Sequence, residues 1–66
     1  MKFDMYDTVI VLNNYSNEGV LKGESGAIVE VYTEPNEAYE VEFLDEEGKT
    51  KAILVLQPNE LCKHND

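Results

Sequence analysis

The chain has 66 residues, and its fourteen acidic and five basic side chains give a formal net charge of −9. This length allows one domain, and the single cysteine excludes an internal disulfide, so the fold must rest on packing and strand pairing. The charge repels phosphate backbones and anionic membranes, which argues against nucleic acid and membrane partners and favours a basic protein partner. The acidic N-terminus has no apolar signal-peptide stretch, so we expect a cytoplasmic protein.

Strand signals dominate the first half of the chain. The β-branched apolar run 8–12 predicts a first strand, and the polar stretch 13–19 that follows it predicts a long loop. Residues 22–26 contain two glycines, which suit a tight turn with positive φ. A second strand is expected over residues 27–33.

The second half of the chain carries the clearest pattern. Residues 39–43 alternate strictly between apolar side chains and glutamate, which predicts a strand with one buried and one exposed face. The other expected elements are a turn at 34–37, a turn at 45–48, a fourth strand at 49–56, a short helical turn at 57–60 and a brief fifth strand at 61–62.

The register of the third and fourth strands follows from the turn at 45–48. If this turn joins Leu44 to Lys49, one register places the apolar residues of both strands on one face and brings opposite charges together on the other face. The expected cross-strand pairs are Phe43 with Thr50, Val41 with Ala52, Tyr39 with Leu54, and Glu42 with Lys51.

These elements predict an all-β fold, a small SH3-like barrel of four to five antiparallel strands with a short 3-10 turn near the C-terminus. Closure into a barrel would remove the sheet edges that a small sheet leaves exposed. We expect a single domain over residues 1–62 and a frayed tail over residues 63–66. The expected core residues are Val9, Val11, Val20, Ala27, Val29, Val31, Tyr39, Val41, Phe43, Ala52, Leu54 and Leu61.

A family resemblance extends over nearly the whole chain. It lies in Tyr6-Asp7, Glu18-Gly19, Leu21-Lys22-Gly23, Gly26, 29–32, 39–43, Gly48, Thr50, Leu54 and Leu61. In these segments the chain resembles the small bacterial domains grouped as domain of unknown function 4926. The resemblance implies an SH3-like barrel and no particular activity. Residues 22–29 are also similar to the KOW segment of ribosomal and transcription proteins, although the basic residues of that segment are largely missing here.

Three glutamates form the first candidate binding surface. The side-chain period of a strand places Glu40 and Glu42 on one outer face, and Glu30 joins them if Val29 and Val31 face the core. Because like charges on adjacent strands cost stability, a basic partner would give these residues a role. The alternative is a solvated surface that only prevents aggregation.

A second candidate surface is apolar. Its residues alternate out of phase with the expected core: Ile10, Leu12, Ile28, Ile53 and Val55. Sharp bending of a small barrel would bury them, and this is the expectation for most of the set. Exposed members would instead form a patch for a partner or a second copy. From this set, Ile28 and Ile53 join Glu30, Glu40 and Glu42 as the expected partner-binding residues.

We expect no catalytic, cofactor or metal site. The single histidine, His64, lies in the expected tail, and no serine or cysteine belongs to a nucleophile motif. Cys62, His64 and Asp66 fall short of a metal-ligand set.

The sequence therefore predicts a non-catalytic protein-interaction module that caps a basic partner, as small acidic immunity proteins and antitoxins do. One alternative is a KOW-like RNA- or ribosome-associated module that uses Lys22, Lys49 and Lys51. Another is a structural homo-oligomer that hides the apolar face.

Overall fold

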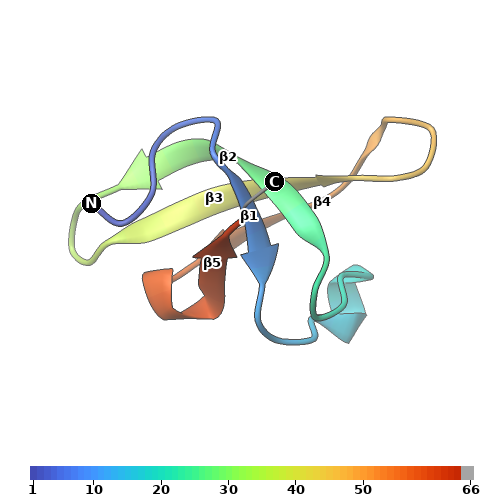
Figure 1. The fold of residues 1–66 in the computed structure, drawn as a ribbon, viewed down its shortest axis with the longest axis horizontal. Coiled ribbons are helices and arrows are strands. Elements are labelled where there is room, and N and C mark those ends of the chain that lie inside the picture. Colours follow the sequence, from blue (N-terminus) through green and yellow to red (C-terminus); the bar gives the residue numbers. More distant parts are fainter. Residues whose placement is uncertain (65–66) are drawn as a thin grey trace.

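The computed structural model describes residues 1–64, which form five β-strands and two short 3-10 turns (Figure 1). In chain order these are β1 (Thr8–Val11), η1 (Ser16–Glu18), β2 (Ser25–Tyr32), β3 (Ala38–Leu44), β4 (Thr50–Leu56), η2 (Pro58–Glu60) and β5 (Leu61–Lys63). The all-β class, the antiparallel strands and the 3-10 turn before the last strand are confirmed.

The strands form one antiparallel sheet in the order β4-β3-β2-β1-β5. Figure 1 shows β1 and β5 crossing in front of the longer strands β3 and β4, so the sheet folds over its own core. Within residues 1–64, β4 and β5 are the two edges of the sheet, and η2 joins them in sequence. The hydrogen-bonded sheet is therefore open, and closure into an SH3-like barrel stays a prediction.

The core lies between the two crossing layers. Of the expected core residues, seven are buried: Val9, Val11, Val20, Tyr39, Val41, Phe43 and Leu61. Another three are partly buried and pack against them: Val31, Ala52 and Leu54. Ala27 and Val29 are half-buried and do not belong to this cluster. The core also contains Phe3, Ile28 and Leu56, which the sequence pattern did not indicate.

A β-bulge in β2 explains the error at Ile28. Ile28 pairs with Val41, whereas the next regular pair joins Glu30 to Glu40, so Val29 is an extra residue on the β2 side. A bulge inverts the alternation that follows it. Ile28 is consequently fully buried, and the prediction that it belongs to the partner-binding surface is wrong.

The observed β3–β4 register differs from the expected one by two residues, one of which comes from a second irregularity. Leu44 pairs with Thr50, but Phe43 pairs with Ala52, so Lys51 has no partner position on β3. The other pairs include Val41 with Leu54 and Tyr39 with Leu56, so the expected register is wrong. Since a shift by two preserves the side-chain faces, the inward face was still identified correctly.

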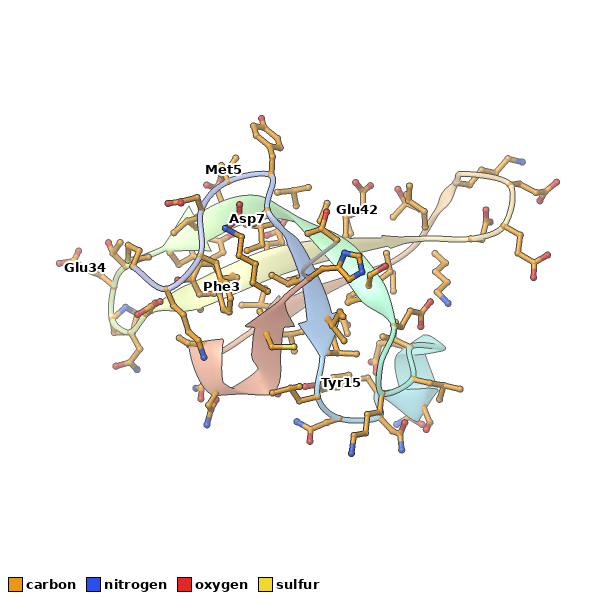
Figure 2. The ribbon with its side chains drawn as sticks, in the orientation of Figure 1. Phe3, Met5, Asp7, Tyr15, Glu34 and Glu42 are labelled. Atoms are coloured by element: carbon orange, nitrogen blue, oxygen red, sulfur yellow. The ribbon has the colours of Figure 1, made fainter. Side chains whose placement is uncertain are left out.

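The N-terminal segment is held by the hydroxyl group of Tyr39. The backbone N–H groups of Lys2 and Phe3 each donate to this oxygen at 3.1 Å, and the hydroxyl donates to Glu37. The rings of Phe3 and Tyr39 meet edge to face with centroids 5.2 Å apart, and Figure 2 shows Phe3 directed into the molecule. Burial raises the pKa of Tyr39, and the Tyr39 hydrogen bond lowers the pKa of Glu37.

Two local features shape the ends of β1 and β2. Gly23 has φ +93° in the expected glycine turn, whereas Gly26 lies in β2. Glycine is required at position 26 because a Cβ there would meet the Glu42 carbonyl oxygen at 2.8 Å. Tyr6 has φ 68°, although it is not glycine. Its N–H donates to the Ile28 carbonyl at 2.8 Å, and this bond fixes the strained turn against β2.

The C-terminal strand extends into the segment expected to be a tail. Lys63 belongs to β5 and pairs with Val9, and the His64 N–H donates to the Thr8 carbonyl at 3.0 Å. The other two residues of the expected tail, 65 and 66, lie outside the described residues. Residues 1–64 contain no helix long and apolar enough to span a membrane.

Candidate partner-binding surface

The candidate surface is the outward side of β2, β3 and β4. We call it the acidic outer face and define it by six residues: Glu30, Tyr32, Glu40, Glu42, Ile53 and Val55. Pairing aligns them in rows, because Glu40 lies opposite both Glu30 and Val55, while Glu42 lies opposite Ile53. The structure thus brings together the three predicted glutamates and Ile53, with the acidic residues central and the apolar ones on the edge strand.

The glutamates of this face are oriented by neutral donors. The Tyr32 hydroxyl donates to Glu40 at 2.8 Å, and the Thr50 hydroxyl donates to Glu42 at 2.5 Å. The hydrogen bond to Glu40 raises the pKa of Tyr32. These contacts position the carboxylates without neutralising their charge.

No lysine compensates the acidic outer face within residues 1–64. The two ion pairs there join Lys51 to Glu24 at 2.5 Å and Lys63 to Asp7 at 3.8 Å, away from the three glutamates. Hydrogen bonding to Lys51 lowers the pKa of Glu24. The expected Glu42–Lys51 pair is therefore wrong, because Lys51 is the bulged residue and pairs with Glu24, which directly precedes β2.

The apolar residues of the acidic outer face are two of the three exposed members of the out-of-phase set, so the expectation that most of this set is buried is wrong. Ile53 is 52% exposed and Val55 is 60% exposed, while Leu12 is 39% exposed elsewhere. Ile10 is half-buried and Ile28 fully buried, so the set divides and does not form one patch.

A shallow apolar hollow of about 360 Å³ adjoins the face at the end of β4. It lies between Tyr32, Val55 and the turn that joins β2 to β3, where Pro35 contributes to its lining. Figure 2 shows Glu34 at this turn directed away from the molecule. Sequence analysis did not assign Tyr32 to this face or indicate the hollow, because the hollow forms only where the turn after β2 meets the end of β4 in the folded sheet.

The long loop between β1 and β2 has a structural role. The Tyr15 hydroxyl donates to Glu60 at 2.7 Å, and the second carboxylate oxygen of Glu60 accepts the Gln57 N–H that caps η2. Burial and the bond to Glu60 raise the pKa of Tyr15. Figure 2 shows Tyr15 beyond the end of β1, and its hydrogen bond to Glu60 ties the loop to η2.

Of the residues weighed as metal ligands, Asp66 lies outside the described residues. No group of three or more His, Cys, Asp or Glu side chains in residues 1–64 could hold a metal ion. Of the three lysines considered for RNA, Lys51 is paired with Glu24, while Lys49 follows the acidic turn Asp45–Gly48 and its N–H donates to Asp45.

Comparison with known protein families identifies the family to which the chain belongs. The family model described as Domain of unknown function (DUF4926) matches residues 5–63. The chain belongs to this family. The matched range of this DUF4926 domain contains all the described strands and every residue of the acidic outer face, and it excludes Phe3. No curated protein and no solved structure matches the chain.

Proposed function

We propose that this DUF4926 domain is a non-catalytic protein-interaction module, whose acidic outer face caps a basic surface of a cytoplasmic partner in the manner of an immunity protein or antitoxin. One observation carries the proposal. Glu30 and Glu40 lie directly opposite each other on neighbouring strands, with Glu42 on the same face.

This arrangement costs stability in the free domain. Like charges opposite each other in an antiparallel pair are destabilising by up to about 1 kcal/mol. A surface that serves only solubility can distribute its acids among turns, as Glu34, Glu46 and Glu47 are distributed. Three uncompensated glutamates in adjacent rows are instead the complement of a basic surface, and they would accelerate its association by electrostatic steering.

The apolar residues beside the glutamates supply the second element of a binding surface. Protein interfaces combine an apolar centre with a charged periphery, and charges alone rarely give high affinity. Ile53, Val55 and the hollow beside Tyr32 offer such contacts next to the carboxylates. The acidic outer face therefore has the composition for both steering and anchoring.

A capture experiment with matched variants tests the proposal. The immobilised domain is incubated with cell lysate, and recovered proteins are identified by mass spectrometry. In one variant Glu30, Glu40 and Glu42 are changed to Gln; in the control Glu18, Glu46 and Glu47, which are exposed and lie outside the face and the hollow, are changed to Gln. Both variants lose the same charge, so nonspecific attraction falls equally.

We expect a basic protein to be recovered by the wild type and by the control variant. Recovery by the variant of the acidic outer face should fall about tenfold, which corresponds to about 1.4 kcal/mol of binding free energy. Equal recovery by the two triple variants would show that the acidic outer face does not bind the partner. Circular dichroism and urea unfolding of each variant confirm that the fold is retained.

A further inference from the structure

We propose that β4 is the docking edge of this surface, and that the partner adds an extended basic segment to the sheet alongside it. The inference rests on the proposed function and names the class of partner and the binding mode. Strand addition uses main-chain hydrogen bonds for affinity and alternate side chains for specificity.

β4 is the longer of the two free edges in the described part of the chain. It runs over Thr50–Leu56 and contains no proline, whereas β5 is limited to Leu61–Lys63. Proteins commonly protect such an edge with proline, a covering loop or several charges. Lys51 is the single charged residue of β4, and it is engaged with Glu24.

The direction of the free hydrogen-bonding groups follows from the sheet pairing. The N–H of Ile28 donates to the backbone carbonyl of Asp7, and the Ile28 carbonyl accepts from the N–H of Tyr6, so both backbone groups of Ile28 point away from β3. Its partner Val41 must then bond to Leu54 on β4, because bonded and non-bonded pairs alternate across an antiparallel sheet.

Ile53 and Val55 flank Leu54, so their N–H and C=O groups point away from β3 to the open edge. No backbone hydrogen bond joins them to another segment within residues 1–64. Their side chains belong to the acidic outer face, which means that one incoming strand would meet free main-chain groups and exposed apolar side chains together.

The charges on β3 select the occupant. Residues of an added strand opposite Ile53 and Val55 would point to the same face, one strand removed from Glu42 and Glu40. Lysine and arginine suit these positions, because their apolar stems can lie along Ile53 and Val55 while the charged groups reach the carboxylates. A second copy of this chain would instead bring a further net charge of −9.

The probe is a blocked seven-residue peptide that alternates arginine with valine. Its twin has the same sequence and charge but carries N-methyl groups on the arginine amides, which would face β4 in the proposed complex. Binding is measured by calorimetry, and amide hydrogen exchange is followed by NMR for every residue of the full chain.

Strand addition predicts that the first peptide slows exchange of the Ile53 and Val55 amides by about tenfold or more. It also predicts that the N-methylated twin binds at least about tenfold more weakly, since several main-chain bonds are lost. Ile53→Pro should weaken binding of the first peptide, because proline is tolerated where an edge N–H faces solvent but cannot donate. Ile53→Val, which keeps the amide and an apolar side chain, should bind the first peptide more tightly than Ile53→Pro.

Equal affinities of the two peptides, or protection confined to β5, would overturn docking on β4. If the variant with Gln at Glu30, Glu40 and Glu42 nevertheless bound both peptides more weakly than the wild type, the acidic outer face would still be the binding surface, but strand addition would not be the binding mode. Failure of both peptides to bind overturns the docking mode, while the capture experiment still decides the proposed function. Concentration-dependent protection of Ile53 without peptide, with a dimer in sedimentation, would assign the edge to a second copy.

Discussion

The hydroxyl group of Tyr39 gives a sharp test of how the N-terminal segment is held. Tyr39→Phe keeps the buried ring and its contact with Phe3 but removes an oxygen that accepts two N–H groups and donates to Glu37. The N–H of Lys2 keeps a second acceptor, the Glu37 carboxylate at 3.0 Å. The N–H of Phe3 is left without an acceptor in a buried position.

The expected cost is set by this one group. A buried donor that loses its partner costs roughly 1–3 kcal/mol, so we expect the free energy of unfolding to fall by about 2 kcal/mol. A domain of this size has a total stability of roughly 3–10 kcal/mol, so the change is large in proportion. It should lower the melting temperature by roughly 10 °C.

Urea unfolding of wild type, Tyr39→Phe and Tyr32→Phe measures this effect. The Tyr32 hydroxyl bonds to Glu40 at an exposed position, so the control should change stability by less than about 0.5 kcal/mol. Exchange of the Phe3 amide should also become faster in Tyr39→Phe. If the two variants unfold at the same urea concentration, the Tyr39 hydroxyl does not anchor the segment.

Three further substitutions test the local geometry. Gly26→Ala should lower stability in urea unfolding by about 1–3 kcal/mol, because a methyl group there would meet the backbone of β3 at 2.8 Å; an unchanged midpoint would contradict the close approach. Tyr6→Gly should be about 1 kcal/mol more stable than Tyr6→Ala, since only glycine relieves φ 68°, and equal stabilities would argue against strain. Lys51→Met should cost up to about 1 kcal/mol at pH 7. Because Lys51 lowers the pKa of Glu24, this cost should be present above about pH 4.5 and disappear as the pH falls through the lowered value, whereas a pH-independent cost would indicate lost packing.

The alternation in residues 39–43 was sufficient to predict the central strand and both of its faces. Tyr39, Val41 and Phe43 are buried, while Glu40 and Glu42 point to the other side. A strand with one polar and one apolar face specifies its orientation through composition alone. The acidic part of the candidate surface was therefore predictable, whereas the direct pairing of Glu30 with Glu40 depends on the bulge at Val29 and was not.

The two bulges were not predictable, because an inserted residue changes the phase of a strand without changing its composition. Val29 in β2 and Lys51 in β4 look like regular strand residues in the sequence. The bulge at Val29 sent Ile28 into the core, and the irregularity at Lys51 replaced an expected partner with Glu24.

The N-terminal segment shows a different limit of prediction from sequence. Phe3 is buried through contacts with Tyr39, which lies 36 positions later in the chain. Local patterns carry no information about such a pair, because a lone aromatic residue near a terminus gives no periodicity. Its packing follows from the position of the Tyr39 hydroxyl, which only the assembled sheet fixes.

The free edge of β4 also bears on how the protein behaves in concentrated solution. An edge open to a partner is equally open to its own copies, and mutual repulsion between strongly acidic molecules keeps them apart. That repulsion fades near the isoelectric point of about 4.3. Acidification therefore removes the electrostatic barrier to edge-to-edge association, and colloidal stability depends on the same carboxylates that we assign to recognition.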